Sequence, residues 1–130
     1  MAGAEVPDVE TSRRIGKAAI AVLIALAADS GFGVLESVWR RSVCLRDLAR
    51  LPAPVIETFC RCDPQLARSR YAARSSTRAP GHFDRQRLED AELWTGEAAQ
   101  PVAGGWPVVE VETTHALDVA ALVRRIGAAR

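Results

Sequence analysis

The sequence predicts an α/β fold in which a parallel sheet lies between layers of helices. Short runs rich in β-branched residues recur at 33–39, 55–60 and 107–113, and a helical pattern follows each of them. This alternation is typical of parallel sheets that carry helices on their faces. The length of 130 residues fits one domain, 1–130, that can bury a hydrophobic core.

Local start and stop signals define the helices between these strands. Thr11 or Ser12 can cap the first helix, and Gly31 ends it. Asp63 followed by Pro64 is a strong start signal for another helix. In chain order the expected helices are 12–29, 42–50, 64–74, 88–94 and 116–130.

The composition excludes two classes of binding partner. The chain is 48% hydrophobic and 25% charged, with a net charge of +1, so neither a nucleic acid nor a membrane surface is an expected partner. The longest apolar run, 18–28, is too short to cross a membrane and is expected to form a buried helix packed on the sheet. Three cysteines, an odd number, fit a reduced compartment, and we expect a cytoplasmic protein.

Function is expected at the carboxyl ends of the strands, where parallel sheets bind ligands. Glu36 would lie at the end of a buried strand, where an unpaired carboxylate is costly, so Arg40 or Arg41 is its expected partner. A substrate or Mg²⁺ contact and a structural ion pair both remain open for Glu36. The residues placed at these strand ends are Glu36, Ser37, Cys60, Arg61, Thr113 and Thr114.

Cys60 and Cys62 form a C-x-C pattern, and Cys44 is distant from them in the sequence. A zinc site would need four ligands with closer pairing, so no metal site is predicted. We expect both cysteines to be small core residues. Gly104 and Gly105 are expected to form a turn.

Three segments together resemble the P-loop kinases of the gluconate and shikimate kinase group and the chloramphenicol phosphotransferases. They are VLESVWRR at 34–41, the helix with Arg70 and Arg74 that leads into GHF at 81–83, and the terminal strand VVEVETT at 108–114. The similarity extends over residues 12–127.

The resemblance implies an ATP-dependent phosphotransferase with Mg²⁺, a small hydroxyl-bearing substrate and a lid at about residues 75–94. By the same resemblance, Arg70 and Arg74 are catalytic, and Arg74, Thr113 and Thr114 contact the cofactor. The resemblance implies that Glu36, Arg40 and His82 bind the substrate.

The sequence contains no G-x-x-x-x-G-K-[ST] phosphate loop. Its one lysine, Lys17, lies in RIGKAAI without a preceding strand. We therefore expect an N-terminally truncated kinase-like protein that is inactive alone. The alternatives are a non-catalytic nucleotide-binding or regulatory module, and a gene remnant or misassigned start of an active phosphotransferase.

The missing loop also implies a missing central strand. We expect three parallel strands, with 55–60 next to 107–111. The strand at 34–38 should either pair directly with 55–60 or leave a slot one strand wide.

Overall fold

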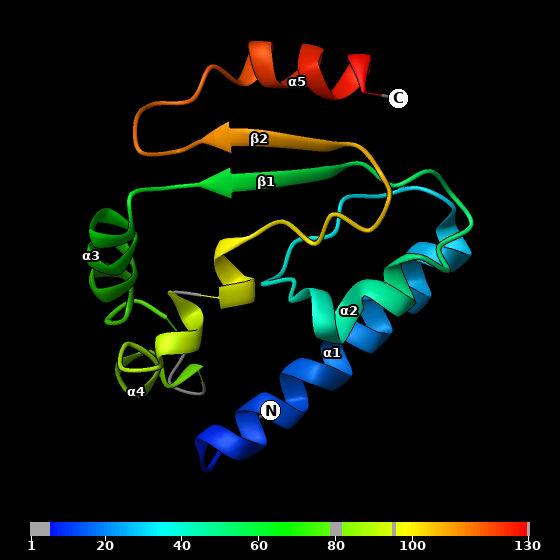
Figure 1. Ribbon diagram of the computed structural model, residues 1–130. Coiled ribbons are helices and arrows are strands. Elements are labelled where there is room, and N and C mark those ends of the chain that lie inside the picture. The colour runs from blue at the N-terminus through cyan, green and yellow to red at the C-terminus, as the bar shows by residue number, and fades with distance from the viewer. Residues whose placement is uncertain (1–5, 79–81, 95, 130) are drawn as a thin grey trace.

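The computed structural model describes residues 6–78, 82–94 and 96–129 (Figure 1). Within these ranges, helices are combined with a small parallel sheet, as expected for the α/β class. The elements are α1 (Val9–Ser30), α2 (Arg41–Leu48), β1 (Glu57–Arg61), α3 (Pro64–Arg74), α4 (Asp84–Arg87), the 3₁₀ turns η2 (Ala91–Leu93) and η3 (Gly96–Ala99), β2 (Val108–Glu112) and α5 (Val119–Ala128).

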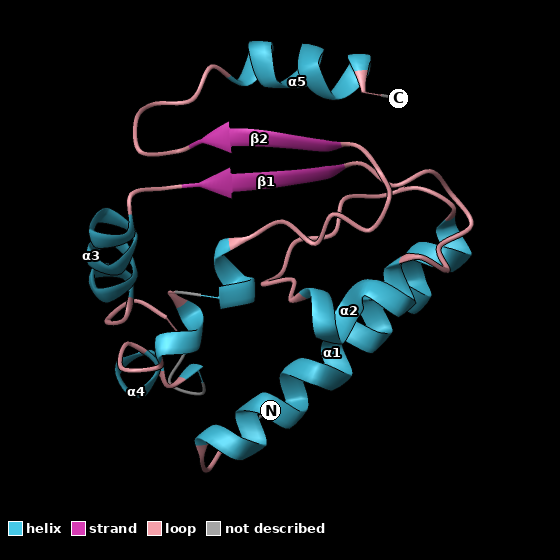
Figure 2. Ribbon diagram, in the orientation of Figure 1, coloured by secondary structure: helices cyan, strands magenta, loops and turns pink. Residues whose placement is uncertain are grey.

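The sheet consists of β1 and β2, paired in parallel from Glu57 opposite Val108 to Arg61 opposite Glu112. This pairing confirms the predicted neighbourhood of 55–60 and 107–111. Figure 2 shows α5 running beside β2 on the side away from β1. There the Arg125 guanidinium donates to the carbonyl oxygen of Glu110 at 2.7 Å, which fastens α5 to the outer edge of β2.

The predicted strand at 34–38 is wrong. Residues 34–38 form no strand, and the Val34 side chain is 95% exposed. The described part of the chain therefore contains two parallel strands and not three, and residues 34–38 do not pair with β1. A β-prone run becomes a strand only where a neighbour pairs with its backbone, and β1 pairs with β2 alone. Residues 1–5 lie outside the described ranges.

The first helix is longer and more exposed than predicted. Its cap is Asp8, which accepts from the Thr11 backbone N–H at 2.7 Å, and it ends as expected at Gly31, whose φ of 72° suits glycine. None of its residues is buried, so the expected burial against the sheet is wrong. No described helix combines the length and the apolar character needed to cross a membrane.

The hydrophobic core comprises a cluster around α2 together with Val109 and Val111 of β2, which are 6% and 2% exposed. Cys44 and Leu48 of α2 and Val102 form the buried centre of the cluster. Partly buried apolar side chains surround them, namely Ile24, Leu35, Trp39, Leu45, Leu51 and Trp106. Cys60 is exposed and Cys62 is half-buried, so the expectation that both are core residues is wrong. Burial raises the pKa of the Cys44 thiol, which keeps this core cysteine protonated.

Helix α3 begins and ends where the sequence predicts. Asp63 accepts from the Leu66 backbone N–H at 2.9 Å, and Pro64 occupies the first turn. The expected lid at 75–94 contains α4 and η2, whereas a helix over 88–94 was predicted. Residues 79–81, which include Gly81 of the GHF segment, lie outside the described ranges.

Glu57 connects the sheet to the core. Its carboxylate accepts from the backbone N–H of Val102 at 2.7 Å, from that of Ala103 at 2.9 Å and from the Trp106 indole N–H at 3.0 Å. From the other side, Arg41 donates to the carbonyl oxygens of Val102 and Ala103. The segment 102–103 is thus held between an anion on β1 and a cation on α2.

We expect Glu57→Gln to lower the free energy of unfolding by about 2 kcal/mol, because charge-assisted bonds are lost and an amide N–H₂ faces backbone donors. Urea denaturation followed by tryptophan fluorescence measures the change. Glu110→Gln is the matched control on β2, since its ion pair with Arg61 is about half exposed, and it should cost less than about 1 kcal/mol. Equal losses in the two variants would contradict a special role for Glu57.

Candidate ligand-binding groove at the carboxyl ends of the strands

The chain segments that leave β1 and β2 are joined to each other. Thr113 donates to the Arg61 carbonyl oxygen through its backbone N–H at 2.7 Å and through its hydroxyl at 2.8 Å. The Thr114 hydroxyl accepts from the Asp63 backbone N–H at 3.1 Å. These bonds fix the backbone at the edge where parallel sheets place their ligand sites.

Arg70 of α3 reaches this edge, as the predicted site requires. Its guanidinium donates to the carbonyl oxygens of Thr113 at 2.7 Å and of Thr114 at 3.2 Å, and it also contacts the Cys62 sulfur at 3.5 Å. Arg70, Thr113 and Thr114 are therefore brought together. Because the carbonyl oxygens occupy the guanidinium donors, Arg70 acts in this arrangement as a brace between α3 and the end of β2.

A groove of about 600 Å³ opens beside this brace. The end of β1 and the start of α3 form one wall, and the segment around η2 and η3 forms the other. Its volume lies within the range typical of small-molecule sites. The lining residues are Phe59, Cys60, Arg61, Cys62, Asp63, Pro64, Ala67, Leu93, Trp94, Ala98, Ala99, Gln100, Glu112 and Thr114.

Trp94, which no motif in the sequence indicated as a site residue, gives the groove an aromatic wall. Tyr71 packs edge-on against its ring with the centroids 5.5 Å apart, and the Arg68 guanidinium lies 5.3 Å from its centroid. The Trp94 indole donates to the Leu88 carbonyl oxygen at 3.1 Å. Its position is therefore fixed from three sides.

The Tyr71 hydroxyl extends this support by donating to Asp84 at 2.8 Å. Burial, and then the bond to Asp84, raise the pKa of Tyr71, so the phenol remains a hydrogen-bond donor across the physiological range. Asp84 itself is buried and also lies 3.5 Å from the Arg78 guanidinium. The aromatic wall is thus tied to α4.

The flank of the groove is strongly basic. Residues 64–88 contain six arginines and one acid, Asp84, a net charge of +5, whereas the whole chain carries +1. The Arg61 guanidinium is neutralised by Glu110 at 2.7 Å. None of the six arginines of 64–88 lines the groove, whose charged lining residues are Arg61, Asp63 and Glu112. The positive charge of the neighbouring segment favours an anionic ligand.

The other residues implied by the resemblance lie elsewhere. Arg74 places its guanidinium 5.8 Å from the centroid of the Tyr71 ring. Glu36 is exposed in the segment before α2, Arg40 immediately precedes that helix, and His82 is exposed ahead of α4. None of these four side chains lines the groove.

The acids at this edge already serve as hydrogen-bond acceptors within the protein. Asp63 caps α3 through the Leu66 N–H, and Glu112 accepts from the Thr114 backbone N–H at 2.7 Å. The Thr114 side chain and then its backbone N–H hold the pKa of Glu112 below its usual range. In the described part of the chain, no group of three or more His, Cys, Asp or Glu side chains is placed to hold a metal ion.

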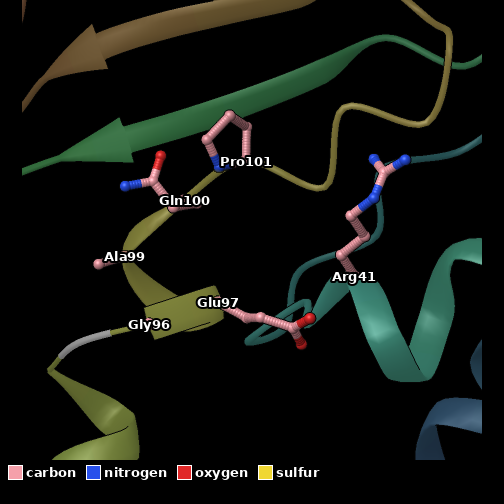
Figure 3. Close-up of a pocket in the computed structure, with 6 residues that line it drawn as sticks. All are labelled: Arg41, Gly96, Glu97, Ala99, Gln100 and Pro101. Atoms are coloured by element: carbon pink, nitrogen blue, oxygen red, sulfur yellow. The ribbon is translucent and has the colours of Figure 1, made fainter.

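A second hollow, of about 490 Å³, lies between α2 and η3 and is lined by Arg41, Gly96, Glu97, Ala99, Gln100 and Pro101 (Figure 3). Glu97 accepts there from the hydroxyl and the backbone N–H of Ser42, which lowers its pKa. Figure 3 shows the Arg41 guanidinium turned away from Glu97. Both charged groups already have partners, so this hollow is less suited to a ligand than the groove beside β1.

We expect Arg70→Ala to lower the free energy of unfolding by about 1 kcal/mol, because the carbonyl oxygens of Thr113 and Thr114 lose a charged donor. Arg124→Ala, an exposed position on α5, is the control and should change stability by less than about 0.5 kcal/mol. Thermal unfolding in the absence of any ligand makes the comparison. An Arg70→Ala variant as stable as the control would show that the brace contributes nothing to folding.

Comparisons with models of protein families, with curated proteins and with solved structures find no match to this chain. The resemblance to P-loop kinases therefore has no independent support from relatives.

Proposed function

We propose that this chain is a non-catalytic module that binds a small anionic ligand with a planar ring, of which a nucleotide is the best-fitting class. The observation that carries the proposal is the groove at the carboxyl ends of β1 and β2, which combines the Trp94 ring with an arginine-rich flank. An aromatic wall suits the face of a base. A basic flank suits phosphate.

Arg68 is the side chain best placed to serve both parts of such a ligand. Its guanidinium lies over the Trp94 ring, and Trp94 lines the groove. A planar guanidinium can stack on an aromatic ring and still donate to phosphate oxygens. Arg74, one turn beyond Arg70 on α3, does not line the groove and contributes in this proposal only to the positive charge of its flank.

Two features favour binding without turnover. Phosphoryl transfer depends on positioning the phosphates and on charge stabilisation, and the 130 residues contain no phosphate loop to do this. Arg70, the expected catalytic arginine, already donates to two backbone carbonyl oxygens. A descent from small-molecule kinases, with a P-loop-like three-layer fold lacking its central strand, belongs to the same proposal.

A cytoplasmic location is also part of the proposal. All three cysteines are free, and two of them, Cys60 and Cys62, line the groove. Thiols at a ligand site persist most readily in a reducing compartment.

We expect no ATP turnover by the isolated chain. Purified protein with Mg·ATP and a panel of sugar acids, nucleosides and hydroxyl-bearing antibiotics should give no ADP above the buffer blank in a coupled assay. The reason is the missing phosphate loop. A rate near 1 per second, the lower end for kinases, would overturn the non-catalytic assignment.

We expect weak binding of ATP, with a Kd above roughly 10 μM, measured by isothermal titration calorimetry without Mg²⁺. Adenosine and inorganic triphosphate should each bind more weakly than ATP, because each offers one half of the ligand. Arg68→Ala should weaken ATP binding about fivefold to tenfold, a loss of about 1 to 1.4 kcal/mol.

Arg124→Ala on α5 is the matched control for that titration and should leave the Kd unchanged. Absence of binding to all three ligands at millimolar concentration would contradict the proposal. An equal loss in both arginine variants would show that the attraction is only general charge.

A further inference from the structure

Helix α1 has two different faces. On one face, apolar side chains spaced as i, i+3, i+4 and i+7 are half-buried, and Ile24 among them packs against the core. These side chains are Ile20, Leu23, Ile24 and Ala27. The opposite face carries Ile15, Val22 and Leu26, which are 52%, 58% and 62% exposed.

The exposed residues form a continuous stripe. Spacings of seven and four residues place Ile15, Val22 and Leu26 on one side of a helix of 3.6 residues per turn. Ala18 and Ala19, also exposed, fill the interval between Ile15 and Val22. A helix that is apolar nearly all round is normally buried on all sides. The stripe is apolar and nevertheless exposed to solvent.

The accessible surface area of the molecule is also larger than expected for a folded monomer. The accessible surface is 9502 Å² for a mass of 14.0 kDa. A folded monomer of this mass is expected to expose about 6700 Å². The excess of about 2800 Å² belongs to the whole molecule, and the stripe contributes three of the ten large apolar side chains that are exposed among the described residues.

We propose that the stripe, defined as Ile15, Ala18, Ala19, Val22 and Leu26, is a dimer interface that pairs with the same stripe of a second copy in antiparallel orientation. A two-fold interface uses one patch on both subunits, so a single self-complementary stripe is sufficient. Antiparallel pairing places Ile15 opposite Leu26 of the second copy. It also places the small Ala19 opposite Val22 of the second copy, which lets the two helices approach closely.

Charge selects the antiparallel direction. Arg14 lies beside the stripe near its start, and Asp29 lies in line with the stripe near its end. In the antiparallel pair, Arg14 is within about 3 Å along the helix axis of Asp29 of the second copy, and the two-fold axis repeats this contact. In a parallel pair, Asp29 would face Asp29 and Arg14 would lie near Arg14, which opposes association.

Sedimentation velocity of the full chain from about 1 to 100 μM tests the interface. We expect a reversible dimer in the wild type and a loss of affinity of at least roughly 100-fold in Val22→Asp, since the charge enters the interface twice. Val123→Asp is the matched control, because Val123 is 63% exposed on α5, and it should change the dimer Kd less than about threefold. Far-UV circular dichroism checks that both variants keep their helices.

Exchanging the charges of Arg14 and Asp29 tests whether the two helices pair in antiparallel orientation. Arg14→Asp and Asp29→Arg should each weaken the dimer about tenfold, and the double variant should recover to within about threefold of the wild type. Failure of the double variant to recover overturns the antiparallel arrangement. A wild type that stays monomeric throughout overturns the interface, and a monomer that sediments with anionic phosphatidylserine vesicles would assign the stripe to a lipid surface instead.

Discussion

Glu57 joins the start of the sheet to the segment 102–107, which is distant from it in the sequence. Its side chain holds residues 102 and 103 by their backbone N–H groups and also holds the Trp106 indole, while its own backbone N–H donates to the Pro107 carbonyl oxygen at 2.9 Å. Gly104 permits this approach, since a Cβ there would lie 2.2 Å from the Trp106 ring. Because Arg41 of α2 holds the same segment by its carbonyl oxygens, the start of the sheet and the core cluster form one unit.

Local signals in the sequence predicted the helices better than the sheet. Asp63 and Pro64 start α3 in the structure as they do in the prediction, and Gly31 likewise ends α1. Both signals are reliable because caps and glycine turns depend on neighbours in the chain. The run at 34–38 has the composition of a strand and yet forms none, since a strand requires hydrogen bonds to a distant segment. The exposure of α1 could not be predicted for the same reason, because the burial of a helix depends on which distant segments pack against it.

The candidate site was predictable in part. Parallel topology alone placed Thr113 and Thr114 at the ligand edge, and the position of Arg70 on α3 brought it to them. Which atoms Arg70 would contact could not be read from spacing. Trp94 gave no signal because its position depends on Tyr71, which lies 23 residues earlier in the chain. The aromatic and the basic parts of the groove therefore become one site only in three dimensions.

The connection between the two strands affects how the molecule folds. Residues 62–107 separate β1 from β2, and this segment must close into a loop before the first inter-strand hydrogen bond forms. Closing such a loop costs conformational entropy. Helices α1 and α3 can form within microseconds from local contacts, whereas the sheet has a high sequence separation of its contacts and forms slowly. We therefore expect the sheet, the groove and the Glu57 contacts to form together, after the local helices.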